Sequence, residues 1–275
     1  MAEAPEAVDT TPTPHPDDEA QALARVLDVP LLAWYPELAS TMDVAHALAQ
    51  RGAPSGTVVL ADAQTRGRGR GGKRWSSGLG AGLWMTLIDR PTDASGIDVL
   101  SLRVGLRAAR ALDRYTSTPI ALKWPNDLML PGGKLGGILV EVRWREQRPE
   151  WVAVGIGVNL VDPGMPGAAA LGADAGPLAE RGAYDDAVRP PDGSRDPVHA
   201  SGAPHASSAT RTEAADRTSV LGELLPALRA ACRTHGALSA AEIREFAARD
   251  WACGRRVCAP QQGTVAGISP AGELL

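Results

Sequence analysis

The strongest constraint on the fold is a set of short β-rich segments in the middle of the chain, joined by tight turns. Residues 127–130 and 137–142 are apolar segments on either side of a Pro-Gly-Gly turn at residues 131–133. Segments separated by so short a turn pair as antiparallel strands. Residues 151–158 form another apolar run, and two more occur at residues 57–61 and 82–88. These runs predict a sheet whose strands return mainly by hairpins.

Helical patterns lie between and after these strands. Ser40 and Thr41 precede an amphipathic run over residues 42–51, and Gly52 follows it. A hydroxyl N-cap and a glycine after the last turn are typical of a short helix. Apolar residues also recur at helical spacing over residues 97–115, 219–235 and 240–251. Separate helices beside hairpin-paired strands indicate an α+β fold, with a mixed, largely antiparallel sheet flanked by helices.

Composition suggests where the main domain lies. Residues 1–24 are rich in Pro, Asp, Glu and Thr, so we expect a disordered tail before a main domain over residues 25–251. Residues 162–216 lose all periodicity, and we expect a disordered insertion there. Residues 252–275 contain a short β segment with turn glycines.

Bulk properties narrow the class of protein. No apolar run reaches the length that spans a bilayer, and the N-terminus has no apolar signal segment. We therefore predict a cytoplasmic protein that does not bind a membrane. The net charge of -4 argues against broad nucleic-acid binding, although a local basic patch would be compatible with it.

Lysine and asparagine are scarce in this chain, and where they occur is informative. The three lysines are Lys73, Lys123 and Lys134, against 25 arginines, and the two asparagines are Asn126 and Asn159. An Arg-rich bias replaces lysine wherever charge alone is needed, so a surviving lysine marks a place that requires a compact point charge. All five residues lie in four short motifs between residues 73 and 159, three of which contain glycines, and this places the predicted active site in the middle of the chain.

The segment over residues 66–74 alternates basic residues with glycines. Arginine side chains recognise carboxylates and phosphates, and glycines let the backbone fold around an anion. Trp75 follows at its edge, where it could stack on a base. The same composition is compatible with an RNA-binding Arg-Gly tract or with a solvated loop, but such tracts repeat, and this one occurs once between two predicted strands.

The remaining motif residues are weaker signals when taken singly. Lys134 follows a tight turn and precedes an apolar strand, a position suited to neutralising charge on a carboxylate or α-phosphate, or to an exposed turn lysine. Asp127 could hold Mg²⁺, orient a lysine or cap a turn, and Asn159 could bind a nucleotide or form a turn.

Taken together, the segments GRGRGGKRW (67–75), KWPND (123–127), GGKLGGIL (132–139) and GIGVN (155–159) resemble those of biotin–protein ligases. The resemblance covers about residues 40–161 strongly and residues 219–275 weakly. It implies a catalytic domain related to class II aminoacyl-tRNA synthetases, followed by a small SH3-like domain that residues 252–275 form only in part. It also implies that biotin and ATP give biotinyl-5′-AMP, with Mg²⁺ bound through ATP. Biotin then passes to one lysine of the biotin carboxyl carrier domain of an acyl-CoA carboxylase.

The resemblance assigns roles to residues at matching motif positions. Lys134 and Arg70 would be catalytic, and the Arg68-Gly69-Arg70 loop would close over biotin and the adenylate. The residues implied for biotin are Ser40, Thr41, Met42, Gln64, Arg68, Gly69, Arg70, Lys134, Gly137, Leu139 and Gly155. Those implied for ATP are Arg70, Trp75, Lys123, Asn126, Asp127, Lys134 and Asn159. Biotin carboxylate would itself be the nucleophile, which agrees with the lack of a Ser-His-Asp order in the sequence.

The chain also departs from the family pattern. Met42 stands where asparagine is frequent, and the first forty residues do not suit a DNA-binding domain, so we expect a monofunctional ligase that does not bind DNA. One alternative is a lipoate– or octanoate–protein ligase on the same scaffold, although those relatives lack the KWPND segment. An RNA-binding module that uses residues 66–74 is the alternative of a different class.

Overall fold

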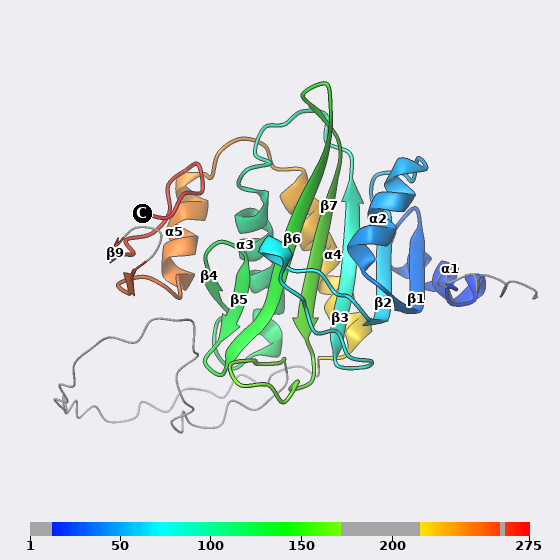
Figure 1. Ribbon diagram of the computed structural model, residues 1–275, viewed down its shortest axis with the longest axis horizontal. Helices are drawn as coiled ribbons and strands as arrows, with labels where there is room; N and C mark the ends of the chain where they lie inside the picture. Colours follow the sequence, from blue (N-terminus) through cyan, green and yellow to red (C-terminus); the bar gives the residue numbers. More distant parts are fainter. Residues whose placement is uncertain (1–12, 172–214, 259–261) are drawn as a thin grey trace, which may run out of the picture.

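The computed structural model describes residues 13–171, 215–258 and 262–275 of the chain. Within these ranges a seven-stranded sheet forms the centre of the main domain, with helices on both of its faces (Figure 1). The strand order is β1-β2-β3-β7-β6-β5-β4, in which β1 and β2 are parallel and all other neighbours are antiparallel. The strands are β1 (Leu32–Leu38), β2 (Val58–Gln64), β3 (Gly82–Asp89), β4 (Ala121–Lys123), β5 (Asp127–Leu130), β6 (Gly133–Arg145) and β7 (Arg148–Asn159).

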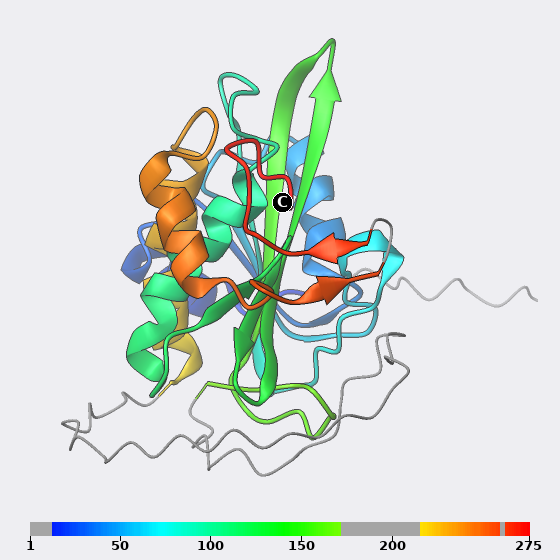
Figure 2. The same ribbon diagram turned by 90° about the vertical axis from the view of Figure 1, so that its left-hand side faces the viewer.

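The helices divide between the two faces of the sheet. In the side view, α3 and α4 cover one face and α2 covers the other, while the β6–β7 hairpin projects beyond both layers (Figure 2). Helix α5 packs against α3 and β4, and α1 against β1. The helices are α1 (Asp17–Val26), α2 (Thr41–Gln50), α3 (Leu100–Leu112), α4 (Arg217–Cys232) and α5 (Ala240–Arg249), with 3₁₀ turns η1 (Arg70–Gly72) and η2 (Asp113–Tyr115).

Alternation along β6 and β7 separates a core face from a second face. Ile138 pairs with Ile156 and Val140 pairs with Val154. Ile138, Val154 and Ile156 are buried in the main hydrophobic core with α3 and α4, and Val140 packs against that core. Because successive strand residues point to opposite faces, the odd-numbered residues over 137–141 of β6 and 153–157 of β7 point the other way. A register shift between β5 and the start of β6 reverses this alternation, so Leu135 is in the core. That second face carries α2 and the functional site.

Several sequence predictions are confirmed. The fold class is correct, and α2 begins after Ser40, whose side chain accepts a hydrogen bond from the Met42 N–H. The turn between β5 and β6 is shorter than expected, because β6 already begins at Gly133. Strand β1, at the sheet edge, escaped prediction because Pro36 interrupts its pattern, a residue that an edge position tolerates. Short β4 also escaped prediction as a strand.

Two predictions of disorder are partly wrong. Residues 17–24 are helical in α1, and the side chain of Ala20 is buried. Residues 162–171 are also ordered against the main domain: Leu171 is buried in the core, and its N–H donates to the Asn159 carbonyl at 2.9 Å. Asp216 caps the first turn of α4. The predicted tail over residues 1–12 and the predicted insertion over residues 172–214 lie outside the described residues.

The C-terminal segment contacts the main domain. Strands β8 (Arg256–Val257) and β9 (Gly263–Thr264) form a two-stranded ladder. Beyond it, the Gly272 carbonyl accepts from the Trp124 indole at 2.9 Å, and the Pro270 carbonyl accepts from the Leu238 N–H at 2.8 Å. The assignment of residues 252–275 to an SH3-like domain stays a prediction.

Candidate functional site

The second face of the sheet contains a trough lined by glycines. Gly137 of β6 pairs with Gly157 of β7, and Leu139 pairs with Gly155 in the next row. Strand β3 continues both rows, because Trp84 pairs with Gly157 and Thr86 pairs with Gly155. Three of the positions in these two rows have no side chain, so other groups approach the backbone of β6 and β7 closely.

Trp75 occupies one end of this trough. A Cβ atom on Gly157 would lie 2.6 Å from the Trp75 indole nitrogen, and one on Gly137 would lie 3.3 Å from a ring carbon. The ring also meets Trp84 edge-on, with 6.3 Å between the ring centroids. The indole N–H is buried without a hydrogen-bond partner among the described residues. The two glycines are therefore what allows the indole to lie flat against the sheet.

Lys134 lies beside this tryptophan. Its Nζ is 5.0 Å from the centre of the Trp75 ring and 2.6 Å from the Asp127 Oδ1. Asp127 of β5 pairs with Gly137, so its carboxylate shares the trough face. The structure thus brings Trp75, Lys134 and Asp127 together, as the sequence predicted. Of the three roles that the sequence left open for Asp127, orienting a lysine is the one that this contact favours, and it stays a prediction.

A network of hydroxyl and amide groups forms a second cluster next to the trough. The Gln64 Oε1 accepts from the Thr41 N–H at 2.8 Å and from the Thr41 hydroxyl at 3.2 Å, and the Gln64 Nε2 donates to the Ser77 hydroxyl at 2.7 Å. The Thr86 hydroxyl donates to the Thr41 hydroxyl at 2.9 Å. These contacts fix Thr41 and Gln64 at the start of α2 and the end of β2. Ser77 and Thr86 are polar members of the cluster that the sequence did not single out.

Met42 closes the trough below this polar cluster. It is 2% exposed, and a Cβ atom on Gly155 would lie 2.8 Å from its terminal methyl carbon. The methionine therefore fills the space that glycine leaves at position 155. This contact gives Met42 an apolar packing role where the family pattern has a polar residue.

The Arg-Gly loop covers a cavity of about 390 Å³ over β6. Two bridges fold it back on itself: the Gly69 N–H donates to the Lys73 carbonyl at 2.8 Å and the Trp75 N–H donates to the Gly67 carbonyl at 2.9 Å. Gly67 tolerates no side chain, since a Cβ atom there would lie 2.5 Å from the Trp75 carbonyl. The cavity-lining residues are 66–74 together with Leu139, Val140 and Glu141.

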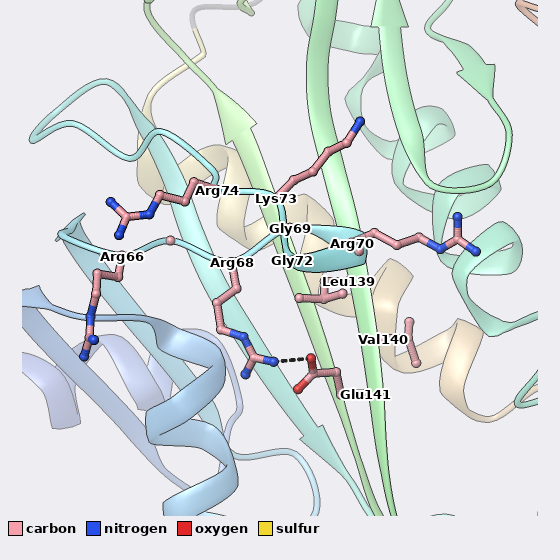
Figure 3. A pocket seen from close by; sticks show the side chains of 12 residues that line it. Arg66, Arg68, Gly69, Arg70, Gly72, Lys73, Arg74, Leu139, Val140 and Glu141 are labelled. Carbon is pink, nitrogen blue, oxygen red and sulfur yellow. Dashed lines mark hydrogen bonds and ion pairs between the residues drawn. The ribbon is translucent and has the colours of Figure 1, made fainter.

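Arg68 anchors this loop to the rest of the domain. Figure 3 shows it directed at Glu141, and it also reaches Asp43 of α2 at 2.8 Å. The His46 Nδ1 accepts from the Trp151 indole at 2.9 Å, so His46 carries its proton on Nε2, which lies 2.9 Å from Glu141. This chain of contacts joins the loop, α2 and β7.

Glu141, Asp43 and His46 were not predicted from the sequence. Glu141 shares the alternation of Gly137 and Leu139, and that period of two was the available signal. Arg70, by contrast, pairs with no acidic side chain in the described part of the chain and points away from Glu141 (Figure 3). The structure therefore gives different surroundings to Arg68 and Arg70, which the sequence assigned to one closing loop.

The other predicted residues lie at the Lys134 end of the site. The Asn126 Nδ2 donates to the Ile138 carbonyl at 2.7 Å, and the Asn159 Nδ2 donates to the carbonyls of Ala169 at 2.9 Å and Lys134 at 3.3 Å. Lys123 of β4 pairs with Asp127 of β5, and its Nζ lies 5.2 Å from the centre of the Trp251 ring.

Two features are absent from the described residues. They contain no group of three or more His, Cys, Asp or Glu side chains placed to hold a metal ion. None of their helices combines the length and apolar character needed to cross a bilayer.

Comparison with known proteins agrees with this geometry. Residues 34–159 match the model of the biotin/lipoate A/B protein ligase family. Over 130 residues the chain is 39% identical to the bifunctional ligase/repressor BirA of Bacillus subtilis, which covers 47% of this chain and 40% of that protein. Over 112 residues it is 38% identical to a biotin–[acetyl-CoA-carboxylase] ligase of Mycobacterium tuberculosis, covering 38% of this chain and 40% of that one. The matches thus span less than half of these relatives.

The fold is also that of a solved ligase. The biotin protein ligase from Aquifex aeolicus, in complex with biotin and ATP, superimposes with a TM-score of 0.63 and 24% identity over 89% of this chain and 90% of that chain. At this identity the likeness shows the shared fold. The superposition extends beyond the matched residues 34–159.

Proposed function

We propose that this chain, whose residues 34–159 belong to the biotin/lipoate A/B protein ligase family, is an ATP-dependent biotin–protein ligase. It would join biotin to ATP as biotinyl-5′-AMP and pass the biotinyl group to a lysine of a biotin carboxyl carrier domain. The curated relatives that match at 38–39% identity carry ligase names, one of them for acetyl-CoA carboxylase. A carboxylase carrier domain is therefore the partner that we propose.

One observation carries the proposal: the motif residues converge on the glycine trough and form two chemically different ends. The end at Thr41 and Gln64 offers hydroxyl and amide groups, which suit the ureido ring of biotin. The end at Lys134 offers a cation beside an aromatic ring, which suits a phosphate next to an adenine base. Ser40, Met42, Gly137, Leu139 and Gly155 lie in or beside the trough between them and would complete the biotin site.

The reaction follows from this placement. An oxygen of the biotin carboxylate attacks the α-phosphorus of ATP, a new O–P bond forms, and the bond to pyrophosphate breaks. The substrate supplies the nucleophile, so the protein contributes positioning and charge stabilisation. Lys134 would leave Asp127 in part to meet the α-phosphate oxygens. Arg70, which has no acidic partner among the described residues, would join it from the loop. In the second step the amine of the carrier lysine attacks the biotinyl carbonyl, and AMP leaves.

Nucleotide recognition would use the residues around Trp75. The indole would stack on adenine, with Asn126, Asp127 and Lys123 from the β4–β5 region toward the phosphates. Mg²⁺ would enter with ATP, and Asp127 is the carboxylate placed to meet it. Arg68 and Gly69 would close over the biotin side.

Two alternative functions, lipoate ligation and RNA binding, can be compared with the structure and the family match. The family model itself includes lipoate ligases, so the substrate must be tested directly. An RNA-binding Arg-Gly tract needs a loop free to wrap a nucleic acid, whereas Arg68 is held by Asp43 and Glu141. The geometry therefore favours a small-molecule site.

The test is to mix the protein with Mg-ATP and either biotin or lipoate, and to measure pyrophosphate and the acyl-adenylate. We expect biotinyl-AMP and pyrophosphate in equal amounts when the acid is biotin, and neither product when it is lipoate. Once a carrier domain is added, we expect that domain to become biotinylated. An adenylate formed with lipoate and not with biotin would show instead that the chain is a lipoate–protein ligase. Salt-dependent RNA binding, with no adenylate formed from either acid, would show instead that the chain is an RNA-binding module.

A further inference from the structure

Strand β7 ends before it reaches Lys134, so one side of the Lys134 backbone has no neighbouring strand. The last pair between β6 and β7 is Gly136 with Val158, so β7 does not reach Lys134. On its other side Lys134 pairs with Met129 of β5. A strand residue with one open side would leave its N–H and C=O to water or to another segment.

Residues 165–171 fill that open side. The Lys134 N–H donates to the Gly167 carbonyl at 2.7 Å, and the Lys134 carbonyl accepts from the Ala169 N–H at 2.9 Å. Together they form a parallel bridge between Lys134 and Ala168. The segment is fixed in turn by its end, because Ala170 and Leu171 are 2% and 1% exposed.

Gly133 is shaped for this contact. Its φ of 139° is in a region that favours glycine, and a Cβ atom there would lie 2.1 Å from the Gly167 carbonyl oxygen. The obstacle is backbone and not the end of a flexible side chain, so a substitution would have to displace segment 165–171. The glycine before Lys134 thus makes room for the segment that holds Lys134.

Asn159 hydrogen-bonds to both Lys134 and segment 165–171. Its Nδ2 donates to the Lys134 carbonyl at 3.3 Å and to the Ala169 carbonyl at 2.9 Å, and its own carbonyl accepts from the Leu171 N–H at 2.9 Å. The side chain is 6% exposed overall. Both donor hydrogens of the amide are therefore committed to backbone carbonyls.

We propose that Asn159 and segment 165–171 are positioning elements that fix the backbone of Lys134 and, through it, the ammonium in the reaction site. This inference rests on the proposed function for its kinetic part. It differs from the role that the sequence suggested for Asn159, because the amide acts on the lysine backbone and not on the nucleotide. It also means that segment 165–171, which follows β7, helps to place Lys134 in the active site.

The kinetic test is a double-mutant cycle between Asn159 and Lys134. Asn159→Leu keeps the approximate volume of the side chain but removes both donors. Since a misplacement of about 1 Å in a reacting group can cost about a hundredfold in rate, we expect kcat for biotinyl-AMP formation to fall by about that factor. KM for ATP should stay within about twofold, because no nucleotide contact is removed.

The cycle separates positioning from direct binding. In a Lys134→Ala background, Asn159→Leu should lower the rate by less than about threefold, because the group that it positions is already missing. Gly133→Ala, which displaces segment 165–171 by another route, should reproduce the kcat loss. Val161→Ala is the matched control, since Val161 is 57% exposed and lies between Asn159 and the segment without belonging to either.

A second readout does not depend on the reaction. The chain has three lysines, so acetylation by an amine reagent followed by mass spectrometry resolves Lys134 from Lys73, which serves as internal reference. Loss of its place beside Asp127 should raise the relative labelling of Lys134 by about threefold in Asn159→Leu and in Gly133→Ala, as an ion pair of this kind implies.

The outcomes are distinguishable. Equal losses from Asn159→Leu in the wild-type and Lys134→Ala backgrounds, or a KM for ATP that rises as kcat falls, would overturn the inference in favour of a nucleotide contact. Unchanged Lys134 labelling in both variants would also overturn it. If the wild-type protein formed no biotinyl-AMP, the proposed function would fail, and the labelling experiment would still decide whether Asn159 positions Lys134.

Discussion

At the residue scale, the site depends as much on missing side chains as on those present. Gly137 and Gly157 give Trp75 a flat surface of backbone, and Gly155 gives Met42 its space. Lys134 then meets this surface with Asp127 on one side and the indole on the other. A small change at any of these positions should act locally, because the surrounding strands are fixed by their neighbours.

Lys134→Arg should not preserve the adenylation rate. The planar guanidinium is larger than the ammonium and would displace either Asp127 or the Trp75 ring, so charge alone does not restore the geometry. We expect a loss of about a hundredfold or more in biotinyl-AMP formation, as for other preorganised charges. Single-turnover kinetics measure it, with Lys73→Arg as the matched control in an exposed loop. A wild-type rate in Lys134→Arg would remove Lys134 from the catalytic assignment.

Gly157→Ala should move Trp75 out of the trough without unfolding the protein. The added methyl group would meet the indole at 2.6 Å, and Trp75 belongs to a loop that can shift. If the ring stacks on adenine, KM for ATP should rise by about tenfold, in line with a stacking contact, while KM for biotin changes little. Gly155→Ala, which meets the flexible end of Met42, is the contrasting variant and should affect biotin first. An ATP KM equal to wild type would argue against stacking by Trp75.

At the element scale, the Arg-Gly loop is a long connection between β2 and β3 whose side-chain ion pairs are concentrated at one residue. Its own backbone bridges give it shape, but Arg68 alone among its basic residues forms ion pairs in the described part of the chain. Asp43 and Glu141 come from α2 and β6, so the anchor joins elements that the loop otherwise only covers. The mobility of the loop should therefore depend on this anchor.

Glu141→Gln should loosen the loop while leaving every basic residue in place. The variant keeps a hydrogen-bond acceptor but removes the charge that faces Arg68 and His46. We expect faster trypsin cleavage after the loop arginines, by about threefold, because a partly exposed ion pair is worth up to about 1 kcal/mol. Biotin and ATP together should slow cleavage in both proteins. Glu150→Gln, whose partner is Arg145 at the hairpin tip, is the control. Equal cleavage of Glu141→Gln and wild type would show that other contacts hold the loop.

At the scale of the whole molecule, one buried arginine joins the helical layer. Arg103 of α3 is 1% exposed and donates to Glu242 of α5 at 2.7 Å, and to the carbonyls of Thr234, Gly236 and Ala237 between α4 and α5. These contacts satisfy the guanidinium away from water. Although burial raises the pKa of Glu242, the hydrogen bonds from Arg103 and Ser239 outweigh it and hold that pKa at about 2.

Stability should consequently depend on pH through Glu242. Its pKa in the folded protein is below its ordinary value of 4.5, so its contribution is complete above about pH 4.5 and is lost as the pH falls toward about 2. Glu242→Gln should lower the free energy of unfolding by about 3 kcal/mol at pH 7, because it leaves the Arg103 charge buried without its counter-ion. The difference from wild type should shrink between pH 4.5 and pH 2. Urea unfolding at several pH values measures it, with the exposed Glu146→Gln as control. A constant difference across this range would contradict the assignment.

The sequence by itself determined most of the local elements and selected motif residues that lie close together in the fold. Ser40 and Gly52 bound a helix that the structure confirms, and the runs over residues 127–130 and 137–142 form the predicted hairpin strands. Scarcity of lysine and asparagine selected Lys134 and Asn159, which proved to be neighbours. These signals are local: a cap, a period or a residue type acts over a few positions and remains visible without the fold.

Only the tertiary structure decided how these pieces act on one another. Trp75 lies on Gly157, Arg68 meets Glu141, and Asn159 binds the Lys134 backbone, each across a wide separation in sequence. Residues 165–171 carry no periodicity because their order comes from backbone hydrogen bonds to β6, which place few demands on side chains. Strand order and loop anchoring arise from packing and pairing between distant segments, and this is why the polar α1 and the ordered start of the predicted insertion escaped a reading of composition.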